Sequence, residues 1–92
     1  MFQKKEIIYS ETIGVCVVDD IVKIKDMYNY YLLRSVSDKM KKAYIPVEHH
    51  SVLLRKLITR EEALKYQAED GFDEKSAQQK GEVAYVLEHI SL

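Results

Sequence analysis

The chain has 92 residues, which is the size of one small domain. Apolar residues make up 47% of it, so it can build a core and is too apolar for a disordered tail. Its 14 basic and 15 acidic residues give a net charge of -1, which indicates neither nucleic acid nor a membrane as partner. No apolar run approaches the roughly 20 residues of a membrane helix. A single cysteine and a polar start favour a cytoplasmic protein.

The first part of the sequence has the composition of β-strands. Short apolar, aromatic and β-branched runs are separated by polar turns and cover residues 6–9, 15–24, 30–36 and 40–47. The second run breaks at Asp19 and Asp20, which predicts a bend there. Residues 52–58 are expected to form a fifth strand or an extended closing segment. Strands this short and closely spaced predict a small antiparallel barrel or curled sheet.

The run at 40–47 alternates most clearly between two faces. The face expected to point to the core carries Ala43, Ile45 and Val47. Lys42 and Tyr44 fall on the other face, and we expect them at the surface. Pro46, the only proline, has no N–H for a ladder, so this strand is expected to lie at an edge or to leave the sheet there.

Helices are predicted after residue 58. Thr59 and Glu62 have the spacing of a capping box, and Gly71 ends the helix that they begin. Asp73 is the expected cap of a second helix, whose polar first half at 75–81 should be exposed or frayed. Apolar residues then recur at helical spacing, at Val83, Val86, Leu87 and Ile90. This stripe is expected either to pack in the core or to contact another chain.

Chemistry-bearing residues are few. His49 and His50 are neighbours on an extended segment and point to opposite faces, so we read them as surface histidines and not as a metal pair. Cys16 lies among valines and is expected to be a buried apolar residue. We therefore expect a non-enzyme without metal or cofactor. Most of the seven tyrosines are expected in the core or barrel wall, with Tyr44 as the exception.

Charge is unevenly distributed along the chain. Residues 38–60 hold six basic and two acidic side chains, a net of +4. Residues 61–92 hold three basic and eight acidic side chains, a net of -5. These segments are either solvated faces or a basic patch that meets an acidic partner or a phosphate backbone. We divide the chain into a barrel at 1–58 and a short acidic helical tail at 59–92.

Four segments of the sequence resemble one family. The segments are residues 8–9 with 14–21, 30–36, 43–47 and 54–63. Their order and spacing resemble those of the CarD family and of the RNA-polymerase-interacting domain of the transcription-repair coupling factor. The resemblance implies a small SH3-like or Tudor-like antiparallel barrel followed by one or two C-terminal helices.

The same resemblance implies a function. Proteins of this family bind the β subunit of bacterial RNA polymerase by adding an edge strand to it, and main-chain hydrogen bonds make that join. The family's contact positions correspond here to Lys23, Ile24, Lys42 and Tyr44. We therefore expect a cytoplasmic bacterial transcription regulator whose basic edge meets an acidic lobe of the polymerase.

Other partners are weighed against this one. CarD proteins touch promoter DNA through a C-terminal domain that uses a Trp, whereas this chain has no Trp and an acidic tail. We therefore expect direct DNA binding to be weak or absent. The alternative function is a self-associating or other protein-interaction module without polymerase binding, with a homodimer as its simplest form. A nucleic-acid-binding barrel that uses Lys39, Lys41 and Lys42 ranks third.

Overall fold

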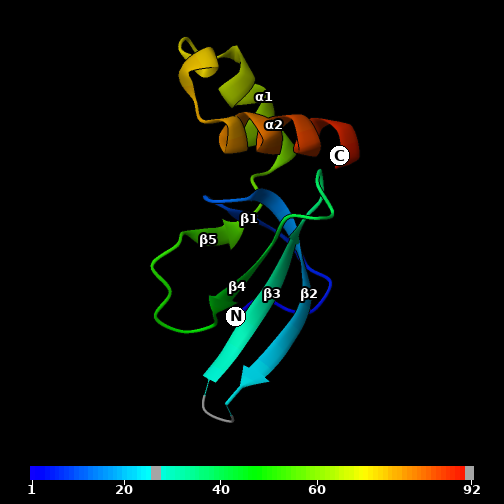
Figure 1. The fold of residues 1–92 in the computed structure, drawn as a ribbon. Helices are drawn as coiled ribbons and strands as arrows, with labels where there is room; N and C mark the ends of the chain where they lie inside the picture. Colours follow the sequence, from blue (N-terminus) through cyan, green and yellow to red (C-terminus); the bar gives the residue numbers. More distant parts are fainter. Residues whose placement is uncertain (26–27, 91–92) are drawn as a thin grey trace.

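The computed structural model describes residues 1–25 and 28–90, in which a five-stranded antiparallel sheet precedes two helices (Figure 1). The strand order is β4-β3-β2-β1-β5. The strands are β1 (Ile7–Ser10), β2 (Gly14–Ile24), β3 (Tyr28–Ser35), β4 (Lys42–Pro46) and β5 (Leu54–Lys56). The helices are α1 (Arg60–Ala68) and α2 (Ala77–His89), with a 3-10 turn, η1 (Phe72–Glu74), between them. The predicted mainly β class with C-terminal helices is confirmed.

The β2–β3 hairpin is the longest part of the sheet. The register of the two strands shifts between Val18 and Asp20, at the place where the sequence predicted a bend. A residue inserted in this way bends its strand and increases the local twist. Figure 1 shows the hairpin extending away from the helices, and the molecule measures 47 × 25 × 24 Å.

The fourth strand begins two residues later than the apolar run suggested. Asp38 organises a turn in front of it: the Met40 N–H donates to Asp38 Oδ1 (3.0 Å) and the Lys41 N–H to the Asp38 carbonyl (2.9 Å). These bonds form a turn over residues 38–41, and β4 starts at Lys42. Its inward and outward alternation is as predicted, because Ile45 is buried whereas Tyr44 is exposed.

The main core lies on one face of the sheet. Its buried members are Ile8, Cys16, Val18, Tyr31, Leu33, Ile45 and Leu54. Ala43 and Val47 pack against this cluster, as the alternation of their strand predicted. The Tyr31 hydroxyl accepts a hydrogen bond from the Phe2 N–H (3.1 Å), so the N-terminal residues are tied to the same core.

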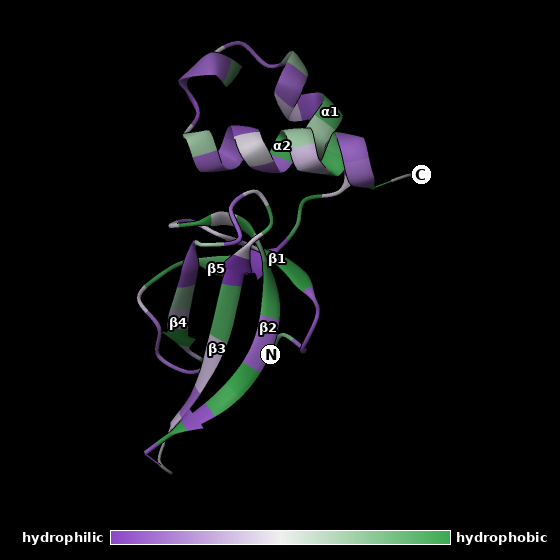
Figure 2. Ribbon diagram, turned by 45° about the vertical axis from the view of Figure 1, so that its right-hand side comes forward, coloured by the Kyte–Doolittle hydropathy of each residue, from purple (hydrophilic) through white to green (hydrophobic). Residues whose placement is uncertain are grey.

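The sheet has two ends. In the described residues β4 pairs with β3 alone and β5 with β1 alone, so the predicted closure into a barrel is not made by a ladder between the end strands. Figure 2 shows that both helices sit over one end of the sheet, opposite the tip of the β2–β3 hairpin. The fifth apolar segment is a strand, but a short one of three residues.

The first helix begins at the predicted capping box. The Thr59 hydroxyl accepts from the Glu62 N–H (3.1 Å), and the Glu62 carboxylate accepts from the Thr59 N–H (3.1 Å). These reciprocal bonds satisfy two of the main-chain donors that a helix N-terminus leaves without partners. Hydrogen bonds to Thr59 stabilise the charged form of Glu62 and lower its pKa. The bond to the main-chain N–H has the larger effect, and the bond to the hydroxyl has the next largest.

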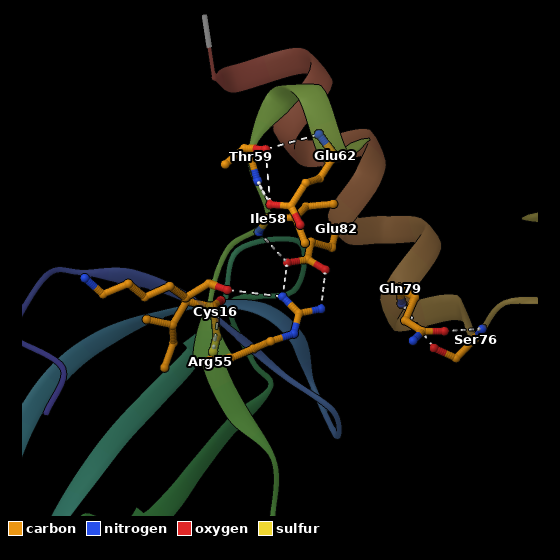
Figure 3. Close-up of polar contacts among 10 residues, drawn as sticks. Cys16, Arg55, Ile58, Thr59, Glu62, Ser76, Gln79 and Glu82 are labelled. Atoms are coloured by element: carbon orange, nitrogen blue, oxygen red, sulfur yellow. Dashed lines mark hydrogen bonds and ion pairs between the residues drawn. The ribbon is translucent and has the colours of Figure 1, made fainter. Parts of the chain in front are cut away.

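The predicted cap of the second helix is wrong. Ser76 is the cap, because its hydroxyl accepts from the Gln79 N–H (3.1 Å) and the Gln79 side chain accepts from the Ser76 N–H (3.3 Å) (Figure 3). Asp73 lies instead in η1, which starts directly after Gly71. Gly71 has a φ of 83°, which glycine adopts without strain, and the chain turns there before α2 begins.

The apolar stripe of α2 packs within the same chain. Val83 and Val86 are buried with Ala63 of α1 in a second small core. Leu87 packs against this core from the side, whereas Ile90 is 40% exposed and follows the end of the helix. Of the two alternatives for the stripe, the structure therefore favours core packing for the valines.

An ion pair with a buried carboxylate joins the helices to the sheet. The Glu82 side chain of α2 is 2% exposed and binds the Arg55 guanidinium of β5 through two hydrogen bonds of 2.7 and 2.8 Å (Figure 3). The Ile58 N–H donates to the same carboxylate (3.1 Å), and the guanidinium lies 4.2 Å from the centre of the Tyr9 ring. Glu82 raises the pKa of Arg55, chiefly through this hydrogen bond. The pair thus fixes α2 against β5.

Candidate partner-binding surface

The exposed edge of β4 is the most distinctive surface of the sheet. Two hydrogen bonds show which main-chain groups next to β4 face β3. The Ser35 N–H donates to the Lys41 carbonyl (2.9 Å), and the Val47 N–H donates to the Asn29 carbonyl (3.0 Å). In an antiparallel ladder, main-chain groups of alternate residues point to the same neighbour. The odd-numbered residues of β4 therefore face β3, and the main-chain groups of Lys42 and Tyr44 point away from the sheet.

The side chains of the same two residues lie on the outer face, which is the face opposite the main core. Lys42 is opposite Arg34 and Tyr44 is opposite Leu32 in the ladder with β3, and directly opposite residues share a face. Tyr44 is 58% exposed and Lys42 is exposed. Lys42 and Tyr44 therefore present both main-chain and side-chain groups to a molecule that approaches this edge.

An ion pair on the outer face sets the charge beside β4. Arg34 donates to Asp19 through Nε (2.8 Å) and through a terminal nitrogen (3.0 Å). The hydrogen bond from Arg34 is the largest influence on the pKa of Asp19 and lowers it; desolvation, the next largest, opposes it, and the charges of Arg34 and Lys42 lower the pKa further. Two cations, Arg34 and Lys42, thus act on the Asp19 carboxylate, while Asp20, opposite Leu32, adds a second carboxylate to the same face.

Lys23 and Ile24 lie in a different place. They belong to the distal part of the β2–β3 hairpin, where Lys23 is opposite Asn29 and Ile24 is opposite Tyr28. Since β4 ends at Pro46, level with Tyr30, both residues lie beyond its end and two strands away from its open edge. The structure therefore brings Lys42 and Tyr44 together and leaves Lys23 and Ile24 apart from them.

A pocket of about 520 Å³ opens at the end of β4. It is lined by Met1, Tyr28, Asn29, Tyr30, Pro46, Val47, Glu48 and His49. Sequence reasoning missed this pocket, because it assigned all tyrosines except Tyr44 to the core or the wall. Tyr28 is 60% exposed, which corrects that expectation. One signal in the sequence could have indicated the pocket: Tyr28 and Tyr30 are two residues apart on a strand and therefore share one face.

The remaining chemistry-bearing residues do not form a site. Cys16 is fully buried, as predicted, and burial raises the pKa of its thiol to about 12. His50 Nδ1 lies 2.7 Å from the Val52 carbonyl, a local contact within its own loop. Across residues 1–25 and 28–90, no group of three or more His, Cys, Asp or Glu side chains is placed to hold a metal ion.

Comparison with known proteins gives no relative: no family model, no curated protein and no solved structure matches the chain. Among the helices of the described residues, none combines the length and the apolar character needed to cross a membrane.

Proposed function

We propose that this chain is a bacterial transcription regulator that binds the β subunit of RNA polymerase by adding β4 to the edge of a sheet in that subunit. The observation that carries the proposal is the open edge of β4, on which Lys42 and Tyr44 direct their main-chain groups outward. Such an edge is a template for a strand of another protein. The resemblance of four segments to the CarD family supports the choice of partner.

The side chains on the edge of β4 determine which partner strand can pair with it. An added strand can form hydrogen bonds with Lys42 and Tyr44 and with the carbonyl of Pro46, and each contributes a net of about 0.5–1.5 kcal/mol. Association itself costs several kcal/mol, so these bonds alone give weak binding. The positive charge of Lys42 favours a strand with acidic side chains on its outer face.

Pairing of two copies through β4 is the alternative to polymerase binding. Lys39, Lys41 and Lys42 precede or begin the strand, and all three are exposed. In an antiparallel pairing of two copies, these lysines would lie towards Glu48 of the other copy, so charge does not exclude that dimer. The other surface considered for self-association was the apolar stripe of α2, whose valines pack within this chain. The resemblance to the CarD family is the reason why we propose polymerase binding.

The proposal is tested with the double variant Lys42→Glu with Tyr44→Ala. Both residues are exposed, so we expect thermal stability close to wild type. Loss of the attractive charge and of the aromatic ring should weaken binding to purified bacterial RNA polymerase core enzyme about 30-fold, measured by biolayer interferometry.

The matched control is Lys65→Glu with Leu64→Ala on α1, where Lys65 is exposed and Leu64 is 49% exposed. This variant makes the same charge reversal and also truncates an exposed apolar side chain, and it should bind like wild type. A folded Lys42→Glu, Tyr44→Ala protein that binds as tightly as the control would contradict the proposal.

A further inference from the structure

The main-chain groups on the edge of β4 are complementary to a second copy of the same strand. Tyr44 is the middle residue of β4, and the main-chain groups of Lys42 and Tyr44 and the carbonyl of Pro46 point away from β3. If two copies pair antiparallel with Tyr44 opposite Tyr44, the two Tyr44 residues exchange two hydrogen bonds. Each Lys42 N–H then donates to the Pro46 carbonyl of the other copy, and the missing N–H of Pro46 ends the ladder on both sides.

This register also brings unlike charges together. Lys42 lies opposite Pro46 of the other copy and therefore diagonally across from its Glu48, and both charged side chains are exposed. The two copies of Lys42 lie about 13 Å apart along the ladder, which is more than the screening length of about 8 Å at physiological salt. Attraction within each Lys42–Glu48 pair therefore outweighs repulsion between the lysines.

An exposed methionine and a pocket are related by the same symmetry. Met40 is 89% exposed and stands two residues before β4, whereas Glu48 stands two residues after it. Pairing about Tyr44 thus brings Met40 level with Glu48 of the other copy, which lines the pocket of about 520 Å³ together with the exposed Tyr28. The flexible methionine side chain suits an irregular apolar pocket. One chain carries both the side chain and the pocket, and this matching points to a second copy as the occupant.

We propose that two copies of this chain pair antiparallel through β4, with Tyr44 at the twofold axis and Met40 of each copy in the pocket of the other. Every contact of such an interface occurs twice, and the assembly closes as a dimer. The inference does not rest on polymerase binding. The dimer occupies the edge that is proposed for the polymerase, so the two complexes exclude each other and self-association lowers the amount of chain that is free to bind.

The test is sedimentation equilibrium of the full chain without any partner. Because the ladder is short, we expect a weak wild-type dimer with a Kd of about 10–100 μM. Met40→Ala removes the apolar anchor and should raise this Kd at least about tenfold. Leu64→Ala on α1 is the matched control and should leave the Kd unchanged. Both side chains are exposed, so both variants should fold like wild type.

Exchange of the charges tests whether the partner is a second copy. Lys42→Glu alone and Glu48→Lys alone each turn both ion pairs of the dimer into pairs of like charge, and each should weaken self-association about tenfold at low salt. An equimolar mixture of these two variants restores both pairs in the mixed dimer. Its Kd should therefore return to within about threefold of the wild-type value.

A cross-link tests the register. Hydrogen-bonded residues opposite each other in an antiparallel ladder have Cα atoms about 5.5 Å apart, which is within the range that a disulfide spans. Tyr44→Cys should therefore form a covalent dimer on mild oxidation, whereas Leu64→Cys on α1 should not. Cys16 is fully buried and does not compete.

The outcomes separate this inference from the proposed function. A wild-type dimer that Met40→Ala weakens and that the mixture of charge variants restores supports the inference. A chain that stays monomeric up to about 1 mM contradicts it, given the Kd expected above. A dimer that Met40→Ala and both charge variants leave within twofold of wild type also contradicts it, because another surface then joins the copies. Binding of such a chain to the polymerase would leave the proposed function standing.

Discussion

The two edge strands of the sheet, β4 and β5, differ in the interactions that join them to the rest of the chain. At the β5 end, Arg55 forms a bidentate pair with the buried Glu82 and thereby fastens the helices to the strands. Beside the β4 end, a second bidentate pair joins Arg34 of β3 to Asp19 of β2 on the outer face, and both of its side chains are partly exposed. The comparison shows that one end of the sheet is anchored within the chain, whereas the other has an edge available to a partner.

Burial decides how much each pair contributes to stability. A buried pair that loses one member leaves a charge without compensation, which costs about 3–5 kcal/mol. Side chains that are about a third exposed contribute roughly 0–1 kcal/mol. Glu82 is 2% exposed, whereas Asp19 is 27% exposed, so the two pairs should respond very differently to the same substitution.

The largest effect is expected from Arg55→Met. It leaves the Glu82 carboxylate with one donor, the Ile58 N–H, and removes the cation over the Tyr9 ring. Since Arg55 itself is 35% exposed, water compensates part of the loss, and we expect a free energy of unfolding lower by about 2–3 kcal/mol. Urea denaturation measures this change. A loss below 0.5 kcal/mol would mean that the helices are not held by this pair.

A smaller effect is expected from Arg34→Met, the matched substitution at the other end. This pair is partly exposed, so the free energy of unfolding should fall by no more than about 1 kcal/mol. The same urea titration compares the two variants directly. Equal losses for Arg34→Met and Arg55→Met would remove the distinction between an anchored end and an open end.

The smallest effect concerns acid titration of Asp19. Its pKa is lowered in the folded chain, chiefly by the hydrogen bond from Arg34, so its stabilising contribution is present above the unfolded value near 3.9. That contribution is lost as the pH falls through the lower folded value. In Arg34→Met the pKa of Asp19 should rise, as followed by the carboxyl carbon NMR shift between pH 2 and 6. An unchanged titration would show that Arg34 does not stabilise the carboxylate.

Local patterns in the sequence predicted the β4 end well. Alternation at period two placed Ile45 inward and Tyr44 outward, and Pro46 indicated an edge, because these features depend only on neighbouring residues. The bend at Asp19 and the capping box at Thr59 are local in the same sense. Whether Lys42 and Tyr44 bind the polymerase stays a prediction.

Features formed by distant residues could not be predicted in this way. Glu82 looks like one more acidic residue of a charged tail, and its partner Arg55 lies 27 positions earlier. The cap at Ser76 depends on where the chain turns after Gly71, which the composition of the segment does not fix. The pocket at the end of β4 requires the register of β3 against β4, which places Tyr30 opposite Pro46.

The most direct test of the central claim compares Tyr44→Pro with Tyr44→Ala in binding to RNA polymerase core enzyme. Both variants lack the ring, but only proline lacks the N–H, and that N–H points away from β3. If β4 joins a strand of the polymerase, Tyr44→Pro should bind about tenfold more weakly than Tyr44→Ala, at similar thermal stability. Equal binding of the two folded variants would show that the β4 edge makes no main-chain ladder with its partner.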